Sequence, residues 1–295
     1  MKDLSTWRRE ARTIDIGGRR IAWWASDEQE DEKPWLLLIH GFPTSSWDWT
    51  GIWPALAPHF RIVALDMLGF GLSEKPRIAY SIMDQADLQE ALLEHLGVSE
   101  AHILAHDYGD TVAQELLARF NERSLSFSIK SICLLNGGLF PERHRPRPIQ
   151  KLGLTPFGPL LGLLMTRARL RKSFDEIYGP KTMASDAEID GHWTLMREGG
   201  GVAVFHRLLR YIPERQKYRD RWVGALKASC APLRLINGGA DPVSGAHLYH
   251  YYKEQVPNAD AVLFEKIGHY PQTEAPVAVA TAFLEFHKRL GTVRA

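Results

Sequence analysis

The 295-residue sequence has only two cysteines, Cys133 and Cys230, far apart in the chain. Two such cysteines form neither a disulfide framework nor a zinc-binding pattern, so we expect a reducing, cytoplasmic location. No stretch reaches the roughly 18 apolar residues that a spanning helix needs. The first ten residues also lack the apolar core of a secretory signal. We therefore expect no transmembrane segment.

A strong excess of charge of either sign is also missing. The sequence has 36 Lys/Arg and 35 Asp/Glu, a net charge of +1. This balance excludes nucleic acid as an obvious partner. The charge is unevenly placed, because residues 137–228 contain 17 Lys/Arg and 9 Asp/Glu. This basic segment is either a solvated face or a surface for anionic ligands, and the pattern leaves both open.

Two common site motifs are absent. The sequence contains no G-x-S-x-G, so it has no serine nucleophile of that kind. The glycines Gly69 and Gly71 lack the third glycine of a dinucleotide-binding fingerprint, and a polar, proline-containing stretch follows them. We expect neither a metal nor a cofactor.

The sequence does have a regular alternation of apolar runs and helical patterns. Its length and its 45% hydrophobic content suit one large α/β domain with an insertion. Strands are expected at Arg12–Ile16, Arg20–Trp24, Trp35–Ile39, Arg61–Leu65, Ile103–Ala105, Ser131–Leu135, Leu233–Ile236 and Ala261–Phe264. They predict a hairpin followed by a mostly parallel, doubly wound sheet. A charged turn is expected at residues 27–33.

The alternation stops between residues 137 and 228, where glycine and proline are dense. Helices are expected near Leu160–Lys172, Asp186–Arg197 and Val202–Tyr211. We predict a helical cap over residues 137–228, on a core made of residues 1–136 and 229–295. The apolar run Leu160–Met165, followed by arginines, fits either the underside of a lid or a peripheral membrane contact, and we favour the lid.

The centre of the sequence is the stretch from residue 101 to 115, AHILAHDYGDTVAQE. A strand passes into a helix over so few residues that the chain must bend sharply, with Ala105 and Gly109 leaving room. This pattern is typical of a nucleophile elbow, with Asp107 where serine is usual. The alternative is that Asp107 is simply the N-cap of the helix.

Two further residues complete a candidate site. Asp107, Asp241 and His269 each follow a predicted strand and stand in the chain order nucleophile, acid, histidine. Because the carboxyl ends of parallel strands meet at one edge of a sheet, we expect the three side chains to converge there.

The motifs HGFP, DMLGFGLSEKP, HDYGD, GGADP and GHYPQTE resemble those of the α/β-hydrolase superfamily. Within it they are similar to the Asp-nucleophile branch of epoxide hydrolases and haloalkane dehalogenases. The mesoderm-specific transcript protein family is the nearest likeness, over almost the whole chain. The stretch LLRYIPERQKYRDRWVGAL carries much of it, because lids normally diverge. The resemblance implies an α/β-hydrolase fold.

A carboxylate nucleophile suits displacement at an sp³ carbon, giving an alkyl-enzyme ester. His269, oriented by Asp241, would then activate a water to hydrolyse that ester. The backbone N–H groups of Phe42 and Tyr108 would form the oxyanion hole.

The leaving group decides the substrate class. In the haloalkane dehalogenases that the sequence resembles, side-chain N–H donors hold the halide. The matching positions here look like Tyr108 and Phe42, whose side chains offer no N–H. Epoxide hydrolases protonate the epoxide oxygen with cap tyrosines, for which Tyr211 and Tyr178 are the candidates. Asp110 departs from the superfamily, where Gly or Ala is commoner.

We therefore predict an epoxide hydrolase acting on a small apolar substrate, with His40, His106 and Trp193 in the substrate-binding wall. A haloalkane dehalogenase-like hydrolase is the runner-up. A ligand-binding or scaffold protein without catalysis stays open as a third reading.

Overall fold

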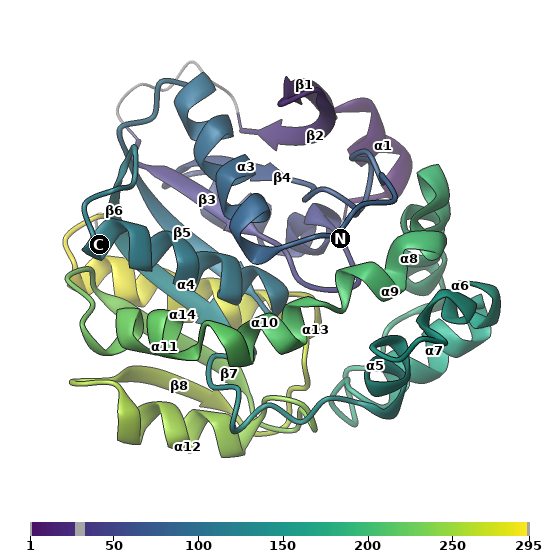
Figure 1. Cartoon of the computed structure of the whole chain (residues 1–295). Coiled ribbons are helices and arrows are strands. Elements are labelled where there is room, and N and C mark those ends of the chain that lie inside the picture. The colour runs from purple at the N-terminus through teal and green to yellow at the C-terminus, as the bar shows by residue number, and fades with distance from the viewer. Residues whose placement is uncertain (1, 27–32, 294–295) are drawn as a thin grey trace.

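The structure is a computed structural model that describes residues 2–26 and 33–293 (Figure 1). Within them, eight strands form one sheet in the order β1-β2-β4-β3-β5-β6-β7-β8. The strands are β1 Arg12–Ile16, β2 Arg19–Ala25, β3 Trp35–Ile39, β4 Arg61–Leu65, β5 Glu100–His106, β6 Ser128–Leu135, β7 Leu233–Gly238 and β8 Asp260–Phe264. The predicted fold class is confirmed. Of the turn predicted at 27–33, all but the last residue lies outside the described residues.

The sheet is parallel from β4 to β8 and antiparallel at one edge. The β1–β2 hairpin pairs antiparallel, and β2 joins β4 antiparallel, with Trp24 opposite Ala64. Strand β3 is central, and Leu36 and Leu38 face one side while Leu37 and Ile39 face the other. Burial on both faces explains why this strand is a continuous apolar run.

Helices cover both faces of the sheet (Figure 1). One face is covered by α3 (Ile82–His95), α4 (Tyr108–Asn121), α11 (Arg219–Lys227) and α12 (Ala246–Gln255), and the other by α2 (Trp53–Leu56) and α14 (Pro276–Arg289). The short elements α1 (Leu4–Arg9), η1 (Ser46–Gly51) and α13 (Pro271–Glu274) lie around them. Because the strands from β4 to β8 are parallel, their carboxyl ends all lie at one edge of the sheet.

The chain between β6 and β7 is helical. It contains α5 Pro148–Gly153, η2 Gly158–Leu160, α6 Leu161–Leu164, α7 Arg167–Asp175, α8 Asp186–Arg197, η3 Glu198–Gly200, α9 Gly201–Leu208, α10 Tyr211–Lys217 and α11. The prediction of a single helix near Leu160–Lys172 is wrong. Helix α6 ends at Leu164, and α7 begins after Thr166, whose side chain caps it. The helix predicted over Val202–Tyr211 likewise ends at Leu208. The cap limits of 137 and 228 stay a prediction.

The last helix of this insertion is fastened to the core. The carboxylate of Glu115 on α4 accepts hydrogen bonds from Arg119, from Arg221 at 2.7 Å and from Trp222 at 2.8 Å. Glu115 is buried, so these bonds lie in a low-dielectric environment. Helix α11 thus packs on α4 beside the sheet, whereas α5 to α9 lie at the right of the view in Figure 1.

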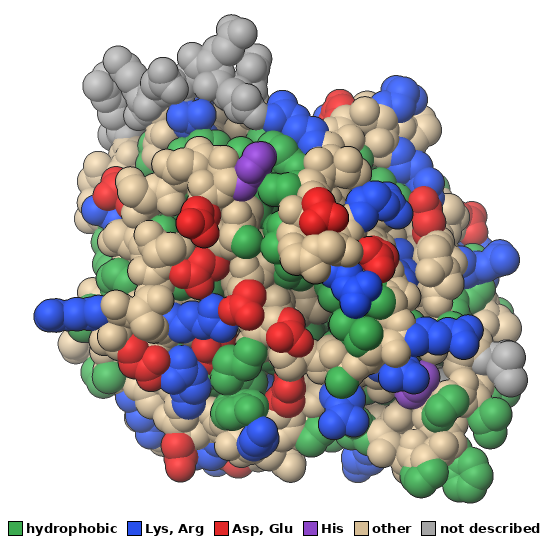
Figure 2. Space-filling model, turned by 45° about the horizontal axis from the view of Figure 1, so that its top comes forward, with side chains coloured by type: hydrophobic (Ala, Val, Ile, Leu, Met, Phe, Trp, Pro, Cys, Tyr) green, Lys and Arg blue, Asp and Glu red, His purple; other side chains and the backbone are tan. Residues whose placement is uncertain are grey.

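Part of the cap exposes apolar side chains. The members of this apolar patch are 40% to 66% exposed: Leu152, Leu154, Phe157, Leu160 and Leu164. Figure 2 shows hydrophobic side chains gathered at the lower right, on the side where Figure 1 draws α5 and α6. The expected lid underside is therefore wrong for Leu160 and Leu164, which face solvent. None of the helices in the described residues has the length and apolar content to cross a membrane.

Candidate active site

The nucleophile elbow predicted at Asp107 is present in the backbone. Strand β5 ends at His106 and α4 begins at Tyr108, so Asp107 alone makes the turn, with φ 48° and ψ −103°. A positive φ at a non-glycine residue is strained and typical of functional sites. In the part of the chain that the structure describes, the Asp107 carboxylate makes no capping bond to α4, so the N-cap alternative is wrong.

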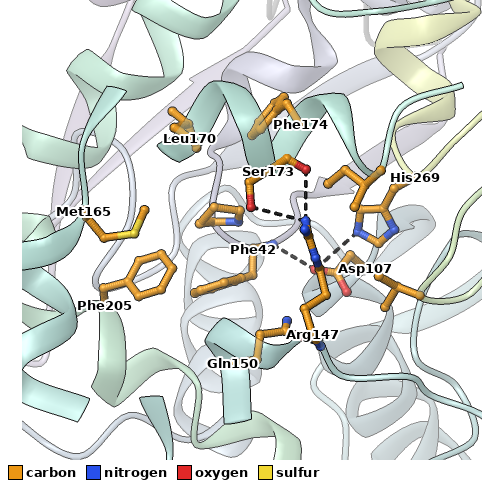
Figure 3. A pocket seen from close by; sticks show the side chains of 13 residues that line it. Phe42, Asp107, Arg147, Gln150, Met165, Leu170, Ser173, Phe174, Phe205 and His269 are labelled. Atoms are coloured by element: carbon orange, nitrogen blue, oxygen red, sulfur yellow. Dashed lines mark hydrogen bonds and ion pairs between the residues drawn. The ribbon is translucent and has the colours of Figure 1, made fainter. Parts of the chain in front are cut away.

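The three predicted triad residues lie together at the carboxyl edge of the sheet. Asp241 follows β7 and His269 follows β8. His269 Nδ1 is 2.8 Å from Asp241 Oδ2. His269 Nε2 is 4.0 Å from Asp107 Oδ2 (Figure 3). All three residues are at most 5% exposed. The structure thus brings a carboxylate, an imidazole and a second carboxylate into one line.

Hydrogen bonds hold Asp241 as a carboxylate. Burial alone would raise its pKa, but the positive charge of His269 and hydrogen bonds from Val243 N, Ser244 and Asn136 Nδ2 lower the pKa of Asp241. The reverse holds for His269, whose pKa burial would lower and the Asp241 carboxylate raises above its usual range. Since Asp241 accepts from Nδ1, the Nε2 atom is left facing the nucleophile.

Two backbone N–H groups were predicted to form an oxyanion hole at Asp107, one in the loop after β3 and one at the start of α4. The N–H of Phe42 donates to Asp107 Oδ2 at 3.2 Å. The N–H of Tyr108 is the first in α4 and so has no partner within the helix. A Cβ on Gly41 would lie 2.5 Å from His106 Nδ1, so only glycine lets this loop approach the elbow. The structure thus brings the Phe42 N–H of the predicted oxyanion pair to Asp107, and the role of the pair stays a prediction.

Sequence reasoning missed a buried arginine beneath the nucleophile. Arg215 on α10 is 2% exposed. Its Nη2 atom donates to the Asp107 carbonyl oxygen at 3.0 Å and lies 3.7 Å from Asp107 Oδ1. Its Nε atom donates to Thr111 Oγ1 at 2.7 Å. The guanidinium also stacks on the ring of Tyr211, 4.5 Å from its centre. A full positive charge thus sits next to the nucleophile.

Asp110, the unusual residue of the elbow, is buried one turn into α4. The backbone N–H of Leu135 donates to its Oδ1 atom at 3.3 Å. Burial raises the pKa of Asp110 well above its usual value, which favours the uncharged form of this side chain beside Asp107.

A cavity opens above Asp107 and His269 (Figure 3). Its volume is about 60 Å³, room for a few water molecules or one small ligand. Its other lining residues are Phe42, Pro43, Arg147, Gln150, Met165, Leu170, Ser173, Phe174, Ile177, Phe205 and Val243. Most come from the predicted cap segment between β6 and β7, and most are apolar.

The two cap tyrosines are placed differently. Tyr211 is buried just behind the wall of the cavity, where its hydroxyl accepts a 3.2 Å hydrogen bond from Gln150. The hydroxyl of Tyr178 donates to Glu188 at 2.7 Å and lies 3.0 Å from Thr273. Tyr178 therefore points away from Asp107, and its expected part in the site does not fit the structure.

The predicted substrate-binding residues lie outside the cavity wall. His40 accepts from Met67 N at 3.0 Å behind the loop, and His106 Nε2 contacts the carbonyl oxygen of His269 at 2.8 Å. Trp193 packs partly buried on α8 under the guanidinium of Arg197. The two histidines support the loops instead, because both ring nitrogens of His40 and the Nε2 atom of His106 contact backbone groups.

Known proteins bear on this geometry. Residues 34–276 match the model of the family described as "alpha/beta hydrolase fold". The chain belongs to the α/β-hydrolase fold family. It is 42% identical to the mesoderm-specific transcript homolog protein of Homo sapiens, over 96% of this chain and 87% of that protein. The resemblance noted in the sequence is thus confirmed.

Solved structures of this family share the fold at low identity. A haloalkane dehalogenase DbeA-M1 loop variant from Bradyrhizobium elkanii superposes with a TM-score of 0.79 at 22% identity, over 96% of each chain. The epoxide hydrolase CorEH superposes with a TM-score of 0.75 at 22% identity, over 95% of this chain and 99% of that one. At this identity the likeness concerns the architecture of core and cap.

Proposed function

We propose that this α/β-hydrolase fold protein hydrolyses an epoxide through a covalent ester on Asp107. One observation carries the proposal: the Asp107 carboxylate stands on a strained elbow between the His269 imidazole and the Phe42 N–H. A serine at this position would suit acyl transfer. A carboxylate attacking an ester would give an anhydride, whereas attack on an sp³ carbon gives a stable alkyl ester.

In the first half-reaction, an Asp107 oxygen bonds to a ring carbon of the epoxide and the carbon–oxygen bond of the ring breaks. The epoxide oxygen takes a proton as this bond breaks, and we assign Tyr211 as the donor of that proton. Burial raises the pKa of Tyr211, so the phenol holds its proton at neutral pH. Because Tyr178 points elsewhere, Tyr211 acts alone in this scheme.

In the second half-reaction, water attacks the carbonyl carbon of the ester. Neutral His269 takes the proton of that water through Nε2, and Asp241 stabilises the imidazolium. The tetrahedral intermediate carries a negative charge, which the N–H groups of Phe42 and Tyr108 and the cation of Arg215 stabilise. When the intermediate collapses, the leaving diol oxygen takes the proton from the His269 imidazolium. The Asp107 carboxyl group gives the remaining proton to the Tyr211 phenolate, which restores the carboxylate and the phenol.

The test is to trap the ester. Replacing His269 with glutamine removes the base but leaves Asp107 free to attack, so the His269→Gln variant should accumulate the adduct. We would expose it to a panel of epoxides and haloalkanes and measure intact mass and the mass of the Asp107 peptide. The control is the double variant with Asp107→Asn, which should gain no mass.

The adduct also separates the two hydrolase readings. A hydroxyalkyl ester on Asp107 supports epoxide hydrolysis, and a plain alkyl ester supports dehalogenation instead. Formation of the same adduct in the Asp107→Asn double variant would overturn the assignment of the nucleophile. Absence of an adduct with folded protein over the whole panel would favour a binding protein without this chemistry.

A further inference from the structure

The cavity above Asp107 contains one feature that an apolar substrate does not need. Among the described residues that line it, Arg147 is the one lysine or arginine. Figure 3 shows its side chain running through the middle of the cavity toward Ser173, with His269 and Phe42 on opposite sides in this view. Only 19% of the side chain is exposed, so burying this charge needs compensation.

The partners of Arg147 are replaceable. Its Nη1 atom donates to the Ser173 carbonyl oxygen at 2.9 Å and to Ser173 Oγ at 3.2 Å. Its Nη2 atom pairs with the carboxylate of Glu176, and the Glu176 side chain is 46% exposed. An ion pair with one partner in solvent contributes about 0–1 kcal/mol. A carboxylate inside the cavity can therefore take the place of Glu176 at little cost.

The charges around the nucleophile favour such an exchange. Asp107 and Asp241 are negative, whereas Arg215, Arg147 and His269, whose pKa is raised, are positive. The group as a whole has one positive charge in excess, which Glu176 balances through its ion pair with Arg147. One anionic ligand would balance it from inside. The basic character of residues 137–228 would also attract an anion to the cap.

We propose that the substrate is a small monocarboxylate, whose acid group Arg147 binds in exchange for Glu176. This inference rests on the proposed function, since it names the substrate of that same site. A planar guanidinium binds a planar carboxylate through two parallel hydrogen bonds. A phosphate would bring a second negative charge beside Asp107, and Arg147 is the one lysine or arginine among the described residues that line the cavity. The predicted substrate thus changes from apolar to anionic with an apolar remainder.

Anchoring also answers a problem of the mechanism. An anionic substrate approaching a carboxylate nucleophile is repelled, and two unit charges 4 Å apart at an effective dielectric of 20 repel by about 4 kcal/mol. Arg147 lines the cavity and Arg215 lies 3.7 Å from Asp107 Oδ1, so both offset this repulsion. The phenylalanines Phe42, Phe174 and Phe205 line the rest of the cavity and would receive the carbon skeleton.

The first experiment measures binding without chemistry. Butyrate and butyramide have the same shape and differ in charge, and neither can alkylate Asp107. We expect the wild-type protein to bind butyrate at least tenfold more tightly than butyramide in calorimetric titration. Arg147→Gln should remove this preference, and Arg147→Lys should keep part of it. Arg145→Gln, an exposed neighbour with the same loss of charge, should bind as the wild type does.

The outcomes are separable from those of the proposed function. Equal binding of butyrate and butyramide by folded wild-type protein would overturn the anion site. So would a loss of preference in Arg145→Gln equal to that in Arg147→Gln. Melting temperatures of the variants test whether Arg147 acts only through its ion pair with Glu176. In that case Arg147→Gln would lower the melting temperature and still prefer butyrate to butyramide, and the inference would be wrong.

The second experiment adds reactivity in the His269→Gln background. Glycidate and glycidamide are matched epoxides, charged and neutral. We expect glycidate to label Asp107 at least tenfold faster, and Arg147→Gln to remove the difference. Equal labelling by both would overturn the substrate class and leave the aspartyl-ester mechanism standing. Selective butyrate binding without labelling by any electrophile would leave the anion site standing and overturn the mechanism.

Discussion

Arg215 sets the electrostatics of the nucleophile. Its charge lies 3.7 Å from Asp107 Oδ1 and is shielded from solvent, so it acts across a low-dielectric gap. In the proposed mechanism it would stabilise the two states in which an Asp107 carboxyl oxygen is negatively charged, namely the free carboxylate and the tetrahedral intermediate. The alkyl ester between them is neutral. We therefore expect the cation to slow alkylation slightly and to speed hydrolysis of the ester.

Arg215→Gln should separate the two half-reactions. We expect ester hydrolysis to slow by about 10²-fold, the size of effect seen when one oxyanion donor is lost. Alkylation should proceed at the wild-type rate or faster. Single-turnover experiments followed by mass spectrometry at pH 8 measure both rates. Arg215→Lys restores the charge and should recover part of the hydrolysis rate.

A matched control is Arg219→Gln on α11, whose exposed side chain pairs with Glu142. It should change neither rate. If Arg215→Gln slows alkylation and hydrolysis by the same factor, the arginine only supports the fold of the elbow and its charge has no part in the second step.

His269 should give the second half-reaction its pH dependence. Burial lowers its pKa, but the carboxylates of Asp241 and Asp107 raise it above the usual range. Hydrolysis needs the neutral imidazole, so the rate should rise with pH until His269 has lost its proton. Alkylation removes the charge of Asp107, which moves that midpoint downward. We expect Asp241→Asn to move it further down and to lower the plateau, in a pH series of ester decay.

The residues of the triad could be predicted because each follows a strand, and parallel strands end at one edge whatever the details of packing. Arg215 and Arg147 could not be predicted in this way. Both come from the cap, and their place beside Asp107 depends on how α10 and α5 dock on the core. Tyr178 shows the same limit, since Glu188 and Thr273 bind its hydroxyl away from the cavity.

At the scale of elements, the elbow depends on the closeness of β3 and α4. A Cβ on Gly109 would lie 2.3 Å from the carbonyl oxygen of Ile39 and 2.6 Å from that of His40. Backbone atoms at such distances must move, and they belong to the central strand. The absence of a side chain at Gly109 is therefore what permits Asp107 to stand at the sheet edge.

Gly109→Ala should unfold the elbow or destabilise the protein by about 3 kcal/mol, the upper range for overpacking a core. Gly224→Ala is the matched control, because a Cβ there meets nothing within 4 Å on helix α11. That change should stabilise the protein by up to about 1 kcal/mol, from helix propensity. Chemical denaturation measures both. Equal stability of the two variants would contradict this account of the elbow.

The central strands were predicted well because they are apolar runs buried on two faces, and Trp35–Ile39 and Arg61–Leu65 match to the residue. The cap was predicted less well. Its helices are short, and some of its apolar residues line the cavity or are exposed, so the apolar pattern does not mark where the helices begin and end. The break before Thr166 follows from a side-chain cap that competes with helix continuation.

At the scale of the whole molecule, the cap and the histidine loop are one unit. The backbone N–H of His269 donates to the carbonyl oxygen of Ile177, just after α7, at 2.8 Å. A Cβ on Gly268 would lie 2.2 Å from the same oxygen. The position of His269, the base of the proposed mechanism, therefore depends on the cap, as well as on the core strand that precedes it.

Glu274 is the clamp of that unit. Its Oε2 atom accepts from Gly268 N and Gly179 N, both at 2.8 Å, and from Thr182 Oγ1 at 2.6 Å, while Oε1 accepts from Tyr270 N at 2.9 Å. One carboxylate thus bonds to the loop on both sides of the base and to the cap segment after α7. Its loss should affect stability and catalysis together.

Glu274→Gln should lower the unfolding free energy by about 2 kcal/mol, since hydrogen bonds to a charged acceptor are lost. In a chain of this size that corresponds to a fall of several degrees in melting temperature. Ester hydrolysis should slow by about tenfold, because a displaced His269 is no longer positioned to take the proton of the attacking water. Alkylation by Asp107 needs no base and should change little. Glu265→Gln, an exposed carboxylate on the same loop, is the control. Slowing of both half-reactions alike, or of neither, would show that the cap does not act through His269.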